Sequence, residues 1–413
     1  MPGALARSAV AASLPPLTLR NALLGLYVLG LGVSISLSQG ALIALSALWL
    51  WRLRDPAARR RVCLPLLAPV LAFSGATILS AVASGHPGTS LLAAKGLLLV
   101  MALYVTVDAL TDGVDADLLV SALVAVCAVA ALAGLVQVLT CWSPPTTPGL
   151  PTRFYRCDRA RGFFSIYMTL AGVLTLVLLA SVPRLLPGPG RRGWLATPWL
   201  VLVAGLAATY VRGAWLGFGA GMAAVIALAR RGRALVALAL IGLVGLALVG
   251  PGQLQQRLRS MTDPQEATIK ERVYMWRSGG AMLQERPLLG VGPGGVKREY
   301  PRFAVPEAVK QRTGHLHNTP LQVLVERGLI GLAAWLWIWV AFYVRAGRLL
   351  FRLGPERRDR RALLVGSLAA ITGFLVSGLS EYNFGDSEVV LVAWTLMALP
   401  FAVSRAPGDG ARG

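Results

Sequence analysis

The chain has 413 residues, of which 55% are hydrophobic and 14% are charged, and its mean hydropathy is +0.63. A soluble globular domain carries about 25% charged residues, so this composition excludes an ordinary soluble protein and indicates an integral membrane protein. The formal net charge of +21 is also compatible with a nucleic-acid partner. The distribution of the charges along the chain decides whether such a partner is expected.

Apolar segments follow one another along most of the chain. A membrane-spanning helix needs about 20 predominantly apolar residues, and about twelve candidate spans are found on this criterion. They lie near residues 20–37, 40–53, 64–83, 90–110, 117–140, 163–183, 195–211, 213–229, 234–250, 328–345, 362–381 and 388–404. We therefore expect an all-α, polytopic integral membrane protein that forms one transmembrane domain over residues 1–413. The first span is predicted to be a signal anchor, because no small-residue cleavage site follows it.

The loops between these spans differ in charge. Arginine clusters follow the second, sixth, eighth and tenth spans, whereas loops 38–39, 84–89 and 382–387 contain no Lys or Arg. Because basic loops stay in the cytoplasm, this pattern predicts that both termini are cytoplasmic. Most of the basic residues therefore set membrane topology, and we expect no nucleic-acid partner.

Two longer loops are basic although they are predicted to lie outside the cytoplasm. Loop 141–162 holds four arginines and one aspartate, and loop 251–318 holds eleven Lys or Arg against six acids. The topology rule does not explain this excess, so an anionic ligand at the outer face is the simplest explanation. The oxidising compartment also permits a disulfide between Cys141 and Cys157, although two loop cysteines need not meet geometrically.

Ionisable side chains gather at the outer ends of the predicted spans. They are Lys95, Arg161, Arg212, His315, His317 and Glu381. Lys95 can instead extend to the interface, and Arg212 can simply anchor the end of its span. Likewise, Arg161 can be one more member of a basic run, and Glu381 can have a structural role by pairing with a cation. Their convergence on one leaflet nevertheless favours a shared function.

The long loop is predicted to contain a helix. The sequence Asp263-Pro264-Gln265-Glu266 resembles an N-cap with a first-turn proline and a capping-box glutamate. An apolar face follows at helical spacing, with Arg272 and Arg277 beside it: Ile269, Val273, Trp276, Gly280 and Leu283. We expect this amphipathic helix to lie against the membrane or over the mouth of the bundle, with its arginines either functional or merely solvated.

The glycine-rich run GVGPGG at residues 290–295 resembles a phosphate-binding loop only in its glycine content. No strand precedes it and no Lys-Ser/Thr follows it, so nucleotide binding is rejected. The glycines are predicted to form a tight turn or to allow close approach of the backbone to a ligand.

The two histidines of the long loop have three alternative roles. His315 and His317 can both ligate a metal on an extended segment, but a third ligand such as His86 or Glu381 has no supporting spacing. Either histidine can also bond a backbone carbonyl and be structural. The third role is that of a general base, because neutral imidazole suits proton abstraction from a hydroxyl, and neighbouring arginines favour the neutral form.

Four motifs together resemble a known family. They are TYVRGAWLGFGAG (209–221), ERVYMWRSGGAMLQERPLLGVGPGG (271–295), HLHNTPLQVLVERGLIG (315–331) and EYNFGDSE (381–388). They are similar to the bacterial O-antigen ligase family, whose relatives include O-antigen polymerases and protein O-oligosaccharyltransferases. The resemblance covers about the second half of the chain and implies a GT-C-like glycosyltransferase in the bacterial inner membrane. Its active site would face the periplasm, beside a long periplasmic loop at residues 251–318 and a shorter one at 141–162.

The resemblance also implies a reaction. The donor would be an O-polysaccharide on undecaprenyl diphosphate, and the acceptor would be a sugar hydroxyl of lipid A–core, with no metal and no cofactor. The catalytic base maps onto His317, and the diphosphate-binding arginines map onto Arg212 and Arg272, with Arg161 a further candidate. Lys95 joins this group on topology alone. The supporting residues are His315, Asn318, Glu326 and Glu381. Direct displacement at the anomeric carbon predicts inversion.

Other functions stay open. An O-antigen polymerase would use the same donor and chemistry with a growing lipid-linked chain as acceptor. A protein O-oligosaccharyltransferase is less favoured, because those relatives often carry a larger C-terminal part. A lipid-linked glycan transporter is a different class, but transporters place binding groups near the midplane within internal repeats, and neither feature is found here. A membrane scaffold would need no intramembrane lysine.

Overall fold

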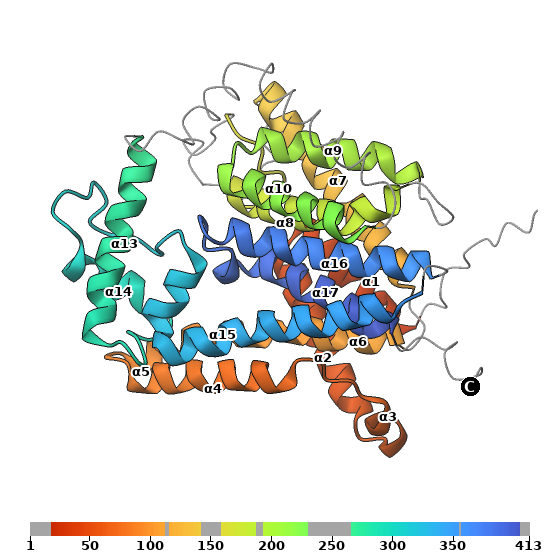
Figure 1. Cartoon of the computed structure of the whole chain (residues 1–413), viewed down its shortest axis with the longest axis horizontal. Coiled ribbons are helices and arrows are strands. Elements are labelled where there is room, and N and C mark those ends of the chain that lie inside the picture. Colours follow the sequence, from red (N-terminus) through yellow and green to blue (C-terminus); the bar gives the residue numbers. More distant parts are fainter. Residues whose placement is uncertain are drawn as a thin grey trace, which may run out of the picture.

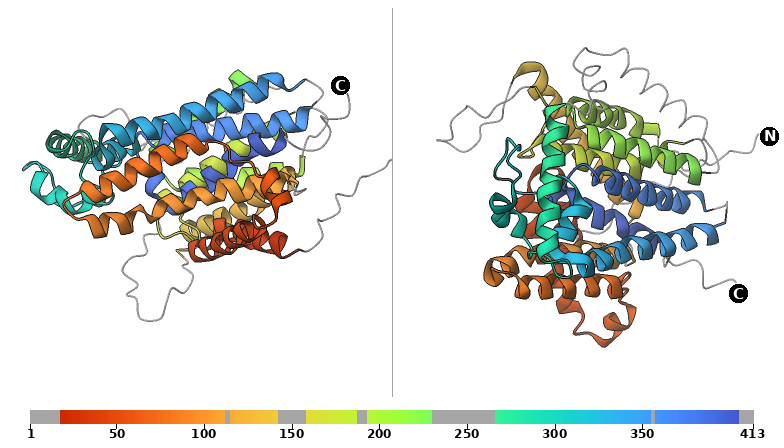
Figure 2. Two further views of the ribbon diagram at one scale, coloured as in Figure 1. Left: turned by 90° about the horizontal axis from the view of Figure 1, so that it is seen from below. Right: turned by 60° about the vertical axis from the view of Figure 1, so that its left-hand side comes forward.

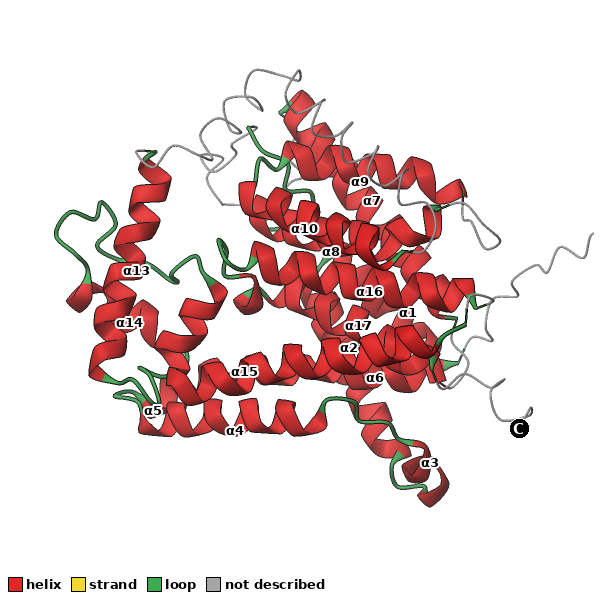
Figure 3. Cartoon of the chain, viewed as in Figure 1, coloured by secondary structure: helices red, strands yellow, loops and turns green. Residues whose placement is uncertain are grey.

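The computed structural model describes residues 18–111, 115–141, 158–186, 193–229, 266–354 and 357–404. Within these ranges every regular element is a helix (Figure 3), which confirms the all-α prediction. The predicted span at 234–250 lies outside the described residues, as do Arg153, Arg156 and Cys157. Cys141 takes part in a disulfide.

Five helical segments in the described part of the chain are long and apolar enough to cross a membrane. They are Pro87–Thr111, α7 (Ala116–Thr140), α8 (Tyr167–Leu185), α15 (Thr319–Arg352) and α16 (Arg358–Ser377). Five shorter apolar helices accompany them: α1 (Leu19–Val33), α4 (Leu67–Ala83), α9 (Ala196–Ala208), α10 (Arg212–Leu228) and α17 (Ser387–Val403). The chain is thus a multi-pass membrane protein, and the number twelve stays a prediction.

Several helix boundaries differ from the predicted ones. The first two predicted spans meet at Ser34 instead of residues 38–39, because the Ser34 hydroxyl accepts a hydrogen bond from Leu37 N and caps α2 (Ile35–Arg52). The short helix α3 (Pro56–Arg61) follows. The segment 87–111 is not one uniform helix, since α5 (Pro87–Ala93) and α6 (Met101–Thr111) are joined by the 3₁₀ helix η1 (Ala94–Val100).

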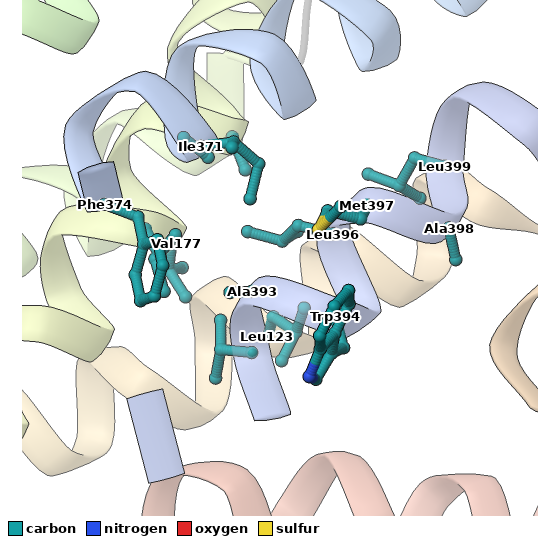
Figure 4. Close-up of a cluster of buried hydrophobic side chains, with 14 of the residues drawn as sticks. Leu123, Val177, Ile371, Phe374, Ala393, Trp394, Leu396, Met397, Ala398 and Leu399 are labelled. Carbon is teal, nitrogen blue, oxygen red and sulfur yellow. The ribbon is translucent and has the colours of Figure 1, made fainter. Parts of the chain in front are cut away.

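The core of the bundle is formed by α8, α10, α16 and α17. Figure 4 shows one apolar cluster with side chains from α7, α8, α16 and α17, and α17 contributes side chains along its whole length. The backbones of α10 and α16 touch, since a Cβ added at Gly217 would lie 2.4 Å from the carbonyl oxygen of Gly373. Small residues that allow such contact are typical of membrane helix pairs. A Cβ at Gly213 would meet Ser380, so the beginning of α10 lies against the loop that follows α16. Arg212, the first residue of α10, is therefore beside that loop.

Helix α15 begins at Thr319, earlier than the predicted residue 328, but it is interrupted at Gly328, where φ is 65° and ψ is −171°. Residues of the preceding loop fill the break. Leu329 N donates to Pro287 O over 2.9 Å, and Ile330 N donates to Leu288 O over 3.3 Å. The predicted start therefore coincides with the point where the long membrane segment of α15 begins.

A helical cap lies at one end of the bundle (Figures 1 and 2). It consists of α13 (Ala267–Glu285), α14 (Gly295–Phe303) and residues 304–327. Its own apolar cluster contains Met275, Met282, Val291, Val296, Tyr300, Leu316 and Val325. The cap occupies the part of the long loop in which the sequence predicts a helix.

The buried face of α13 differs from the predicted one, of which only Leu283 packs against the apolar cluster of the cap. The buried residues are Met275, Ser278, Gly279 and Met282. Trp276 is exposed over 36% of its surface, and its indole Nε1 donates to Leu316 O over 2.9 Å. Leu316 packs closely over Gly279, where a Cβ would lie 2.7 Å from the leucine Cδ1, and this contact selects the buried face. The predicted capping sequence at 263–265 lies outside the described residues, and α13 begins at Ala267.

Candidate active site

An open cleft of about 370 Å³ lies between the cap and the bundle. Its walls come from the start of α8, the turn between α9 and α10, α13, and the loops before α15 and after α16. Four cationic side chains line it: Arg159, Arg212, Arg272 and Lys310. His317, Glu271 and Glu381 line it as well. The structure therefore brings together four of the residues that the sequence singled out: Arg212, Arg272, His317 and Glu381.

The centre of the cleft is a three-residue arrangement around Glu381. The His317 Nδ1 lies 3.3 Å from Glu381 Oε2, and Arg272 Nη2 donates to Glu381 Oε1 over 2.8 Å. The side chains of His317 and Glu381 are 15% and 12% exposed. A carboxylate at Nδ1 fixes the proton on that nitrogen, which leaves Nε2 as the acceptor of a proton from a substrate. The predicted pairing of Glu381 with a cation is thus present, and the carboxylate also contacts His317.

The backbone holds His317 in an uncommon conformation. Its φ is 48°, a left-handed value that few residues other than glycine adopt. Hydrogen bonds fix both sides of it, because Leu316 N donates to Gln322 Oε1 over 2.8 Å and Asn318 Oδ1 accepts from Leu321 N over 2.9 Å. Strain of this kind persists only where the surrounding structure enforces it, and it is concentrated at functional sites.

Asn318 and the residue after it join the beginning of α15 to the loop after α16. Asn318 Nδ2 donates to Leu379 O over 2.9 Å, and Thr319 Oγ1 contacts Glu381 O and Asn383 Oδ1, each over 2.9 Å. These bonds set the spacing between His317 and Glu381. The supporting role predicted for Asn318 is therefore matched by contacts that position the cleft.

Arg212 lies at the first position of α10, where the helix N-terminus already favours negative charge. Its Nη2 contacts Glu266 Oε2 over 3.0 Å and Thr268 Oγ1 over 2.7 Å. Burial works to raise the pKa of Glu266, but hydrogen bonds from Thr268 and Arg212 outweigh it and lower the pKa below its usual value. Arg212 is thereby held at the wall of the cleft by an ionised partner.

His315 lies behind His317. The two rings meet edge to face with centroids 4.2 Å apart, and the His315 ring also lies 5.7 Å from that of Tyr382. Burial, reinforced by His317, lowers the pKa of His315 to about 4, so the ring is neutral near pH 7. His315 does not line the cleft and supports His317 by packing.

Glu326 lies in the protein interior, away from the cleft. Its carboxylate accepts from Gln322 Nε2 over 2.9 Å and from Arg327 Nη1 over 3.0 Å, and its backbone carbonyl accepts from Ser80 and Gly292. It therefore joins α4, α15 and the glycine-rich loop. Its supporting role is structural.

The glycine-rich loop approaches protein backbone closely. Gly290, Gly292 and Gly294 all have positive φ. A Cβ at Gly290 would lie 2.5 Å from the carbonyl oxygen of Val325, so glycine is needed where this loop crosses α15. In the described structure the close approach is made to α15, and the predicted approach to a ligand stays a prediction.

Two predicted diphosphate ligands do not line the cleft. Lys95 is exposed on η1, and Arg161 is half-buried in the segment before α8. Arg159 lines the cleft instead, with its guanidinium 4.4 Å from the ring centroid of Tyr167. The basic run that contains Arg159 and Arg161 was visible in the sequence, but an irregular segment gives no periodicity that would identify which arginine faces inward.

The metal alternative needs a third ligand beside the two histidines. His86 instead lies 3.8 Å from Glu299, and Glu381 is engaged by Arg272 and His317. Within the described ranges no group of three His, Cys, Asp or Glu residues is placed to hold a metal ion.

Comparisons with known proteins place these residues in a family context. A family model described as O-antigen ligase matches residues 198–336, which include Arg212, Arg272 and His317. The exopolysaccharide production protein ExoQ of Rhizobium meliloti (strain 1021) is 28% identical over 251 residues, which is 57% of this chain. The match spans 56% of the length of that relative. Both comparisons confirm the resemblance to the O-antigen ligase family.

Proposed function

From this relationship to the O-antigen ligase family, we propose that the chain is a glycosyltransferase that moves a glycan from a lipid diphosphate to a sugar hydroxyl at a membrane surface. The single observation that carries the proposal is the Glu381–His317 pair, 3.3 Å apart, in a cleft walled by guanidinium groups. The acid–base pair and the cations supply the two functions that this transfer needs.

The cations bind the diphosphate. Arg212, Arg272 and Arg159 reach the same cleft from three different segments of the chain. Guanidinium groups match phosphate oxygens geometrically and keep their charge in a site with little water. Since negative charge develops on the leaving diphosphate as its bond to the sugar breaks, cations fixed in advance lower the barrier.

His317 acts on the acceptor. Its Nε2 takes the hydroxyl proton while the acceptor oxygen attacks the anomeric carbon, and the bond from that carbon to the diphosphate oxygen breaks. The leaving diphosphate keeps the electron pair of that bond. Glu381 holds Nδ1 and stabilises the imidazolium that forms. One displacement inverts the configuration at the anomeric carbon and needs no covalent intermediate.

The more specific proposal is an O-antigen ligase in the bacterial inner membrane. The donor is undecaprenyl-diphosphate-linked O-polysaccharide, the acceptor is lipid A–core, and the cleft faces the periplasm while both termini are cytoplasmic. The O-antigen ligase family region at residues 198–336 supports the ligase reaction, and the positive-inside charge pattern supports the orientation. The reaction is proposed to be independent of metal ions.

A second candidate function rests on the ExoQ match. That relative is described as an exopolysaccharide production protein, which favours an acceptor that is itself a growing lipid-linked glycan. Such a polymerase would use the same donor, the same base and the same cations. The two candidates differ only in the product.

The test is transfer in vitro by the purified full-length chain from undecaprenyl-diphosphate-linked polysaccharide, with lipid A–core as acceptor and EDTA present. Wild-type protein is expected to form glycosylated lipid A–core. His317→Ala is expected to lose about 10²- to 10⁴-fold in rate, the usual contribution of a general base. His86→Ala removes the only other histidine outside the His315–His317 pair and should leave the rate unchanged.

Each other outcome is decisive. Lengthening of the donor glycan without transfer to lipid A–core would favour the polymerase. Loss of wild-type activity with EDTA that returns on adding Mg²⁺ would contradict metal independence. A folded His317→Ala variant with the wild-type rate would contradict the general-base role.

A further inference from the structure

A second cavity, of about 590 Å³, lies at the opposite end of the helices from the cleft. The end of α2, the short helix α3 and the helix α6 form it. Ser90, near the start of segment 87–111, bonds Arg298 of the cap, whereas Asp108, near the end of that segment, lines the cavity. With a rise of about 1.5 Å per residue in the α-helical parts and about 2.0 Å in η1, the chain between them rises about 30 Å, close to the thickness of the hydrocarbon core of a bilayer. Figure 1 shows α3 far from α13 and α14.

The charge of this cavity is mainly positive. Arg52, Arg54 and Arg61 line it, together with two acids. Both acids have bonds within the protein, since Asp108 accepts from Arg52 Nη1 over 3.0 Å and Asp55 caps α3 by accepting from Ala57 N over 2.9 Å. The net positive lining therefore suits an anionic ligand.

An exposed tryptophan places the cavity at a membrane interface. Trp51 is 64% exposed, and the guanidinium of Arg54 lies 4.2 Å from its ring centroid. Exposed tryptophan beside arginine is typical of the level of lipid headgroups. The neighbouring Leu50, 57% exposed, provides apolar surface for an acyl chain.

We propose that this cavity binds the headgroup of an anionic phospholipid. Arg54 and Arg61 contact the lipid phosphate, and the acyl chains run along the exposed face of α2. The positive-inside rule explains an excess of arginine on this side, but it does not require three of them to line one cavity beside an exposed tryptophan. Basic pockets between transmembrane helices on the cytoplasmic side are known to hold anionic headgroups.

The test measures retention of phosphatidylglycerol and phosphatidylcholine by the purified full-length protein, using native mass spectrometry and lipid-dependent thermal stability. The Arg54→Gln/Arg61→Gln variant removes two charges from the cavity. The matched control, Arg60→Gln/Arg348→Gln, removes two exposed arginines that do not line it. Wild type and control should bind phosphatidylglycerol alike, and the cavity variant should bind it about 30-fold more weakly, given the usual contribution of each basic residue near a membrane surface.

Equal retention of both lipids by wild-type protein would overturn the proposal, and so would equal losses in the cavity and control variants. None of these measurements depends on glycan transfer.

Discussion

The bundle core and the helical cap are held together by different forces. In the core, α17 buries apolar side chains along its length, and α10 meets α16 through Gly217 and Gly373. In the cap, a hydrogen bond donated by Trp276 and two accepted by the side chains of Asn318 and Gln322 fix the segment that carries His317. Cores accept many apolar substitutions of similar volume, whereas a bond network depends on particular donors and acceptors. The cap is therefore where single residue types matter most, and it contains most of two of the four family motifs, 271–295 and 315–331.

Among changes that should affect the cap more than the core, Gly328→Ala is expected to have the largest effect. The φ of 65° is unfavourable for alanine, and its Cβ would lie 2.1 Å from Leu288 O. Strain and displacement of the 287–291 segment should cost about 3 kcal/mol. Thermal unfolding should show a lower melting temperature, and limited proteolysis should cut the cap first.

The control for this change is Gly347→Ala, in the same helix, where nothing lies within 4 Å of an added Cβ. It should shift stability by less than about 0.5 kcal/mol. Equal melting temperatures for the two variants would show that the break in α15 contributes nothing to stability.

The next largest effect is expected from Glu381→Gln. Glutamine retains the shape of the side chain but loses the charge that stabilises an imidazolium at His317, so kcat should fall about 100-fold while KM changes little. Steady-state glycan transfer measures this. Glu285→Gln, which changes an exposed glutamate paired with Arg302, is the control. A raised KM with unchanged kcat would instead make Glu381 a residue that only shapes the binding site.

A smaller effect should distinguish the two arginines before α8. Arg159 lines the cleft and Arg161 does not, so Arg159→Gln should raise the KM for the lipid-diphosphate donor about tenfold, more than Arg161→Gln does. Donor titrations of both variants test this. The reverse order would restore the sequence-based assignment of Arg161 to the diphosphate.

The smallest expected effect is the pH dependence of folding stability that His315 causes. Burial lowers the pKa of His315 to about 4 from an unfolded value near 6.5, so between these values the unfolded chain binds the extra proton. Stability should therefore fall as the pH drops from 6.5 towards 4. His315→Gln should flatten this part of the profile of melting temperature against pH, and His86→Gln should not. Parallel profiles for wild type and His315→Gln would contradict the prediction.

The comparison of the two regions also explains what the sequence could reveal. Apolar runs and charge asymmetry predict spans and sides, and these were sufficient to gather Arg212, His317 and Glu381 at one place, whereas Arg272 was assigned from the family resemblance. Side-chain types alone do not report how a hydrogen-bond network is connected. Glu326, part of the same motif as His317, thus proved to be a structural residue in the interior.

Periodicity failed where a helix carries two apolar stripes. In α13 the predicted stripe contains Val273 and Trp276, and the buried stripe contains Met275 and Met282. The choice between them is made by Leu316 and Tyr300, which come from other segments of the cap. Lys95 likewise could not be placed, because η1 does not follow the α-helical period that was assumed for its span.

The break at Gly328 has a consequence for the order in which the protein is made. Leu329 N and Ile330 N use the carbonyl groups of Pro287 and Leu288 in place of groups within α15. An unpaired backbone donor is costly where water is absent, so these two groups depend on the loop being docked. The loop precedes α15 in the chain and emerges earlier from the ribosome. Both acceptors are therefore already synthesised when the helix that needs them is made.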